Sequence, residues 1–190
     1  TGTAAVINVP AGGDLQAALN AAHSGDTISL AAGATYTGNF RLAPNAGPEW
    51  ITVQSSAIGS LPGPGTRVSP DQAAAMPKIV TPNSASALQI TTGANYYHFI
   101  GIEFFAAPGM YIQDVIQVGT SAESSVDQLP HDIDFDRDYI HTDASAGGKR
   151  GIALNGGSTT VQHAYLSGFW STWRDRRGRG CWNGRGGYPM

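Results

Sequence analysis

The chain has little charge and a single cysteine, and both shortages limit what it can be. Only 13% of its 190 residues are charged, against about 25% in an average soluble domain. Cys181 has no second cysteine to pair with, so an intrachain disulfide is excluded and stability must come from packing. No stretch approaches the roughly 18 consecutive apolar residues of a membrane helix, so we expect no membrane partner.

Glycine, by contrast, is abundant. It accounts for 25 of the 190 residues, well above the average usage of about 7%. Low charge with frequent glycine favours short strands joined by tight turns over a helical bundle. The length is sufficient for one domain with a sizeable core. The chain begins at Thr1 without a signal peptide, which is compatible with a secreted protein whose leader has been removed.

The most informative pattern is a pair of short apolar strands that occurs three times, within 87–104, 115–140 and 151–166. The first strand of each copy contains Leu88, Ile116 and Ile152, respectively, so the copies are offset by 28 and then 36 residues. Matching strands at an unequal period predict coils of a solenoid separated by loops of different length. One such coil cannot bury its apolar face alone, so it needs neighbours on both sides.

Shorter signals complete the organisation of a single domain. A helix is predicted at 14–22, with Asp14 as its N-cap, and further strands at 27–30, 39–42, 51–54 and 78–80. We interpret residues 1–24 as an N-terminal cap and 25–169 as coils. The Gly- and Pro-rich segment 55–77 is then a long lateral loop, with a helical turn at 69–76.

The segment 170–190 departs from the repeat. It contains five arginines and one aspartate, whereas the rest of the chain is acidic. An acidic body repels phosphate, so we expect no nucleic-acid partner. The departure fits a truncated or altered longer protein, or a tail that caps the last coil or packs on another molecule. An uncapped C-terminal coil would expose a backbone edge, so self-association through it is also expected.

Several of these segments resemble right-handed parallel β-helix proteins of the pectate-lyase-like superfamily. Residues 9–19, 24–30 and 33–36 resemble the N-terminal cap and first coil, and 131–141 and 149–156 resemble later coils. The resemblance covers roughly residues 5–167 and implies an all-β right-handed parallel β-helix with a short N-terminal capping helix. The superfamily includes polysaccharide lyases, glycoside hydrolases, esterases, phage tailspikes and proteins of no known activity, so the fold leaves the activity open.

An acidic run gives the strongest chemical signal. Strand alternation places Asp132 and Asp134 on one face, and carboxylates this close are easier to hold around a hard cation such as Ca²⁺. In lyases of this superfamily, Ca²⁺ bridges acidic side chains and a substrate uronate while a Lys or Arg removes a proton. The resemblance therefore implies Ca²⁺ at Asp132, Asp134 and Asp136. Lys149 and Arg150 would be catalytic if the next coil brings them near. The alternative is a row of hydrated aspartates on an exposed strand.

Alignment of the three copies separates Asp138 from this run. It occupies the position of the apolar residues Ile102 and Ala164, so it is predicted to point inward at a corner between two sheets. There its carboxylate would accept hydrogen bonds from backbone N–H groups.

The same alignment predicts an outward column of Glu103, Tyr139 and Tyr165. These residues are candidates for substrate binding, because sugar rings stack on aromatic faces. The alternative is an aromatic ladder that only stabilises the stack.

Arg137 and His163 align on neighbouring coils and are further substrate-binding candidates. The histidines could in principle form a zinc site, but their sequence spacing is not the close spacing of typical zinc ligands. We therefore favour surface or turn positions for His98, His131, His141 and His163.

Together these signals predict a secreted polysaccharide-active protein, most specifically a Ca²⁺-assisted lyase of acidic polysaccharide. Two other classes stay open. One is a non-catalytic structural or assembly β-helix that stacks end to end or forms fibres, and the other is a carbohydrate-binding module.

Overall fold

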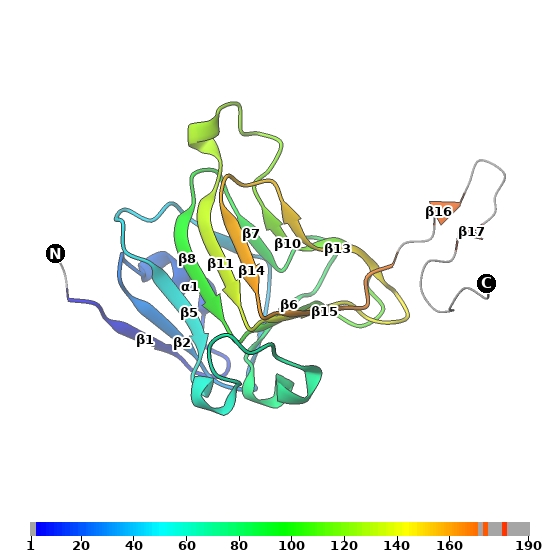
Figure 1. Cartoon of the computed structure of the whole chain (residues 1–190), viewed down its shortest axis with the longest axis horizontal. Helices are drawn as coiled ribbons and strands as arrows, with labels where there is room; N and C mark the ends of the chain where they lie inside the picture. The colour runs from blue at the N-terminus through cyan, green and yellow to red at the C-terminus, as the bar shows by residue number, and fades with distance from the viewer. Residues whose placement is uncertain (1–2, 171–172, 175–179, 182–190) are drawn as a thin grey trace.

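The computed structural model describes residues 3–170, 173–174 and 180–181, and most of its strands form three parallel sheets (Figure 1). Six-stranded sheet A contains, in spatial order, β1 (Val6–Val9), β2 (Thr27–Leu30), β5 (Ile51–Ser55), β8 (Asn95–Ile100), β11 (His131–Asp136) and β14 (Thr159–Gln162). Five-stranded sheet B contains β3 (Thr35–Thr37), β6 (Lys78–Thr81), β9 (Glu103–Ala106), β12 (Tyr139–His141) and β15 (Tyr165–Ser167). Four-stranded sheet C contains β4 (Phe40–Leu42), β7 (Leu88–Ile90), β10 (Ile112–Val118) and β13 (Gly148–Leu154).

The chain visits sheets A, B and C in turn and then begins the next coil, which is the path of a parallel β-helix. This confirms the predicted fold class. A separate antiparallel pair joins β16 (Trp173–Arg174) to β17 (Gly180–Cys181). These four residues belong to the predicted tail, and the rest of 171–190 lies outside the described residues.

The strand registers confirm the repeat residue by residue. Ile116 of β10 pairs with Leu88 on one side and Ile152 on the other. Likewise, Phe135 of β11 pairs with Phe99 and with Val161. Equivalent residues of successive copies therefore stack directly, about 4.8 Å apart per coil.

Apolar side chains fill the space enclosed by the sheets. Phe99 stacks on Phe135 with ring centroids 5.2 Å apart. Phe104 meets both rings edge-on, and all three side chains are fully buried. These inward side chains account for the apolar residues that alternate with polar ones in the predicted strands.

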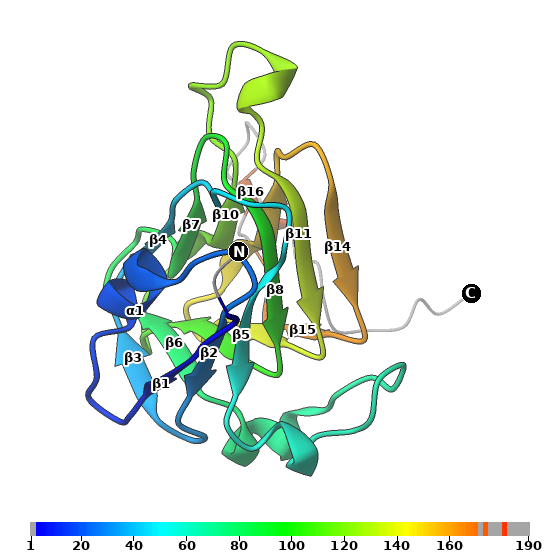
Figure 2. The same ribbon diagram turned by 90° about the vertical axis from the view of Figure 1, so that its left-hand side faces the viewer.

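Helix α1 (Leu15–Ala21) lies at the N-terminal end of the coils (Figure 2). As predicted, Asp14 is its N-cap and accepts a hydrogen bond of 2.9 Å from the Ala17 N–H. Leu15 and Leu19 are buried in the main core. The segment before the helix was not predicted as a strand, yet β1 pairs in parallel with β2 and extends sheet A.

The segment between β5 and β6 is the long lateral loop that the sequence predicted. It contains two short 3₁₀ helices, η1 (Ile58–Ser60) and η2 (Pro70–Ala75), the second at the predicted helical turn. A third, η3 (Val126–Gln128), lies in the connection between β10 and β11. Within the described residues, no helix is both long and apolar enough to cross a membrane.

Candidate functional site

The corner between sheets A and B fixes the orientation of several predicted site residues. Its first residue has a positive φ in three successive coils, at Gly101 (67°), Arg137 (57°) and His163 (51°). A Cβ at Gly101 would lie 2.2 Å from the end of the Leu61 side chain, so a larger residue there would displace Leu61 of the long loop. The second corner residue points inward, and in the middle coil this residue is Asp138.

Asp138 is fully buried, as the alignment predicted. Its Oδ1 accepts a hydrogen bond of 2.7 Å from the Ile102 N–H, whereas Oδ2 has no hydrogen-bond partner. Burial raises the pKa of Asp138 well above its usual value, and the hydrogen bond from Ile102 and the charge of Arg137 oppose this shift only in part. Asp138 is therefore a structural corner residue that favours its protonated form.

The three other aspartates lie on the outer side of sheet A, which we call the aspartate face. Asp134 Oδ2 accepts a hydrogen bond of 3.1 Å from Gln162 and lies 3.4 Å from His98 Nε2. Burial raises the pKa of Asp134, and the nearby His98 opposes that effect. Asp132, which has a positive φ of 52°, pairs with the adjacent His131 at 2.8 Å.

Asp136 holds together the two corner residues that the sequence proposed for substrate binding. Its Oδ2 accepts a hydrogen bond of 2.8 Å from Arg137 Nε, and its Oδ1 lies 2.9 Å from His163 Nδ1. Arg137 is buried and also donates to the Pro62 carbonyl at 2.8 Å. The guanidinium is thus committed to internal contacts and has little surface left for a ligand.

These contacts do not fit a calcium ion. Ca²⁺ takes six to eight oxygen ligands, but each of the three carboxylates already accepts from a neighbouring histidine, amide or guanidinium. Within residues 3–170, no group of three or more His, Cys, Asp or Glu side chains is arranged to hold a metal ion. The aspartates form separate pairs rather than one ligand cluster.

Lys149 and Arg150 lie on β13 in sheet C, so they do not stack on the aspartates of sheet A. Within its sheet, β13 pairs with β10 of the coil before it, so the next coil does not bring Lys149 and Arg150 to the strand that carries the aspartates, which was the condition for their predicted role there. Arg150 instead makes a two-pronged ion pair with Asp114, with Nη2 3.2 Å from Oδ2. Its side chain remains 47% exposed, whereas that of Asp114 is 12% exposed.

Sheet C carries a third exposed cation, Arg41 of β4, and we call Arg41, Lys149 and Arg150 the cationic set. Arg41 begins an outward row that continues through Gln89 and Gln117, each in direct register with the next. In the part of the chain that the structure describes, neither Arg41 nor Lys149 lies within ion-pair distance of a carboxylate. Arg41 and Asp114 carry no local motif, so nothing in the sequence marked them as site residues.

The predicted column of Glu103, Tyr139 and Tyr165 is present on the outer side of sheet B. Glu103 lies 2.6 Å from Lys78 Nζ and 2.9 Å from His141 Nε2. Burial opposes the ionisation of Glu103, but the hydrogen bonds from His141 and Lys78 outweigh it and lower its pKa.

The long loop lies over this column. Leu61, Val68 and Met76 form a second apolar cluster that packs against Tyr139 and Tyr165. Arg67 lies over the Tyr165 ring, 5.2 Å from its centroid. The two tyrosines therefore serve as packing surfaces for the loop, which favours the ladder interpretation over an open sugar-binding face.

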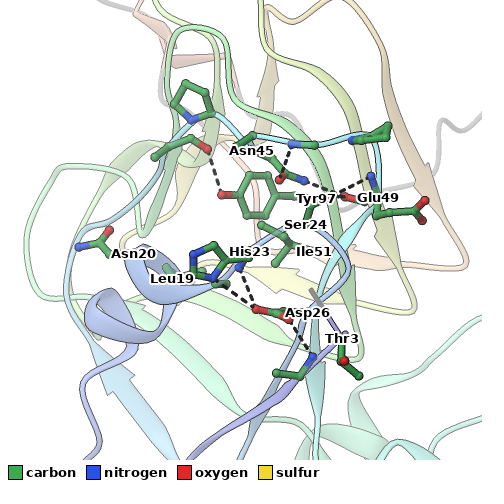
Figure 3. Close-up of a pocket in the computed structure, with 17 residues that line it drawn as sticks. Thr3, Leu19, Asn20, His23, Ser24, Asp26, Asn45, Glu49, Ile51 and Tyr97 are labelled. Atoms are coloured by element: carbon green, nitrogen blue, oxygen red, sulfur yellow. Dashed lines mark hydrogen bonds and ion pairs between the residues drawn. The ribbon is translucent and has the colours of Figure 1, made fainter. Parts of the chain in front are cut away.

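A cavity of about 750 Å³ lies near the N-terminal end, between the turn after α1 and the loop before β5 (Figure 3). Several of its polar groups are already partnered: Tyr97 donates to the Ala43 carbonyl at 2.9 Å, and Asn45 donates to the Glu49 carbonyl at 2.8 Å. Asp26 accepts the N–H groups of His23 and Ala5, both at 2.8 Å, and these bonds lower its pKa. These bonds hold the cavity walls and leave few free groups to recognise a ligand.

Comparison with known proteins identifies a fold and no family. No family model matches the chain, and no curated protein matches it. Among solved structures, the chain is similar to the crystal structure of an alginate lyase from Paenibacillus sp. str. FPU-7, with a TM-score of 0.51 and 17% sequence identity. The match covers 86% of this chain and 58% of the lyase chain. At this identity, the likeness establishes the fold alone, and this chain spans 58% of the length of the lyase chain.

Proposed function

We propose that this chain is polysaccharide-active and, more specifically, a lyase that cleaves acidic polysaccharide along sheet C. The observation that carries the proposal is the cationic set on a molecule whose formal net charge is −3. The likeness to an alginate lyase supports a substrate of this class.

Charge separates sheet C from the other two candidate surfaces. The aspartate face would repel the carboxylates of a uronate polymer, and the loop covers the tyrosine column of sheet B. On sheet C, Arg41 and Lys149 are exposed without ion-pair partners among the described residues, and Arg150 is held in a fixed direction by Asp114. The amides of Gln89 and Gln117 would hydrogen-bond the sugar hydroxyls between the charged positions.

The reaction that fits these groups is β-elimination. Arg150 would bind the carboxylate of the reacting sugar, which acidifies the proton on the adjacent carbon. Lys149 would remove that proton. The electron pair left on carbon forms the double bond and expels the glycosidic oxygen, which takes a proton from water. No step requires the aspartates of sheet A.

The test measures the ultraviolet absorbance of unsaturated product from a panel of uronate polymers, including alginate. We expect Lys149→Ala to lower the rate by about 10²-fold or more, the usual contribution of a general base, and Arg150→Gln to raise KM. Arg67→Gln removes the same charge over sheet B and should leave the rate unchanged. A chelator should leave the wild-type rate unchanged, since the aspartates do not fit Ca²⁺.

Two results would overturn the proposal. One is the absence of unsaturated product from every polymer, and the other is a wild-type rate in Lys149→Ala. Loss of activity with a chelator, restored by Ca²⁺ and abolished by Asp134→Asn, would instead return the chemistry to the aspartate face.

A further inference from the structure

A group of aromatic rings, one exposed and two half-buried, lies on the outer side of sheet A and has no role in the proposed elimination. Trp50, directly before β5, is 40% exposed. Its ring meets Tyr96 of β8 edge-to-face at a centroid distance of 5.8 Å, and Tyr96 meets His131 of β11 in the same way at 5.8 Å. We call Trp50, Tyr96 and His131 the aromatic trio. It extends from the start of β5 across β8 to β11, three strands that lie side by side in Figure 1.

The trio is oriented before any ligand arrives. The edge-to-face contacts fix each ring against the next, and Trp50 also contacts His98 at 6.2 Å. Tyr96 is held with a positive φ of 56°, which is uncommon for a residue other than glycine. Rigid aromatic side chains lose little entropy when a ligand binds, so preorganised rings suit a binding surface.

Polar groups border the rings on the same face. Asp132 pairs with the trio's own His131, and Asp134 lies between His98 and Gln162 on adjacent strands. The amphipathic rings offer apolar faces, and the carboxylates and the amide offer hydrogen-bond acceptors and donors. This combination matches a sugar, which has apolar C–H faces and a rim of hydroxyl groups.

We propose that the aromatic trio is a binding site for a neutral saccharide chain. The charge of the surface selects neutral sugars, because the aspartate face would repel uronates. The site lies on a different sheet from the cationic set, so it stands whether or not the chain is a lyase.

The test uses isothermal titration calorimetry of the whole chain with neutral gluco-, manno- and xylo-oligosaccharides and with oligoalginate as the acidic comparison. We expect at least one neutral oligosaccharide to bind with release of heat and to change the tryptophan fluorescence. Trp50→Ala should weaken this binding roughly tenfold, and Trp50→Phe should retain most of it. Tyr111→Ala is the matched control, since Tyr111 is a 42% exposed aromatic residue elsewhere on the chain.

Lys149→Ala should bind the neutral ligand as the wild type does, which separates this site from the proposed elimination. The inference is overturned if no neutral oligosaccharide binds, or if Trp50→Ala and Tyr111→Ala weaken binding equally. Binding of oligoalginate as strong as that of the neutral ligands, and dependent on Trp50, would also overturn it. Circular dichroism of each variant checks that a loss of binding is not a loss of fold.

Discussion

At the scale of single residues, position in a coil decides the chemistry of a side chain more than its type does. Asp134, Asp136 and Asp138 are separated by only one residue each, yet they have three different environments. Asp134 is half-buried beside His98, Asp136 joins Arg137 to His163, and Asp138 lies in the core. An aspartate run in sequence therefore becomes separate pairs and one buried acid.

The buried acid makes stability depend on pH. The pKa of Asp138 is raised in the folded chain, so the folded state retains a proton that the unfolded state releases above about pH 3.9. Stability is consequently lost as pH rises from about 3.9 towards the folded pKa, by about 1.4 kcal/mol per pH unit within that window.

We expect Asp138→Asn to keep the acceptor for the Ile102 N–H and to remove this loss. Its melting temperature should exceed that of the wild type by more at about pH 7 than at about pH 4, as measured by thermal unfolding. Asp127→Asn, at an exposed position, is the control and should show no such trend. A difference between Asp138→Asn and wild type that stays constant with pH would contradict the assignment.

At the scale of elements, the long loop is the part of the chain whose structure depends most on side-chain contacts. Its contact with sheet B is made by the second apolar cluster, in which Met76 is fully buried. This cluster is separate from the main core. We therefore expect the loop to open while the coils remain folded.

Met76→Ala should weaken the loop contact by about 2–5 kcal/mol, the usual cost of truncating a buried methionine. Hydrogen exchange should accelerate first in residues 56–77. The melting temperature of the coils should fall by less than it would if the whole chain lost this free energy as one unit. Val126→Ala, at a 78% exposed side chain, serves as the control. Equal acceleration in the loop and in β8 would show that the loop and the coils unfold as one unit.

At the scale of the whole molecule, the stack has two ends with different coverings. Helix α1 lies at the N-terminal end, whereas β14 and β15 are the last strands of their sheets. Among the described residues, Leu154, Val161 and Leu166 at this end are 56%, 37% and 41% exposed. Exposed apolar side chains beside strand edges favour association with another chain.

We therefore expect concentration-dependent self-association, measured by light scattering. Because the two ends differ, the contact would be head-to-tail and would extend into filaments if it did not close. Val161→Lys should lower the association by placing a charge at the edge, whereas Val126→Lys, on the η3 loop, should not. A wild-type chain that stays monomeric at high concentration would contradict this expectation.

Most of the fold could be predicted from the sequence because the repeat is written in strand alternation. The alignment placed Leu88, Ile116 and Ile152 in one row, and it predicted the inward position of Asp138 correctly. Strand β1 was missed, since the short segment 6–9 precedes the first recognisable turn. The candidate site was harder to predict, because its residues come from strands on different coils and sheets.

The sequence by itself determined the parallel coils, the capping helix, the inward rows and the outward column, because these follow from local periodicity and spacing. Only the tertiary structure decided which outward side chains are available. The loop covers Tyr139 and Tyr165, and Arg150 pairs with Asp114 rather than meeting the aspartates. The physical reason is that coil stacking fixes neighbours at each position, whereas loop packing and the choice of sheet depend on contacts between residues far apart in the chain.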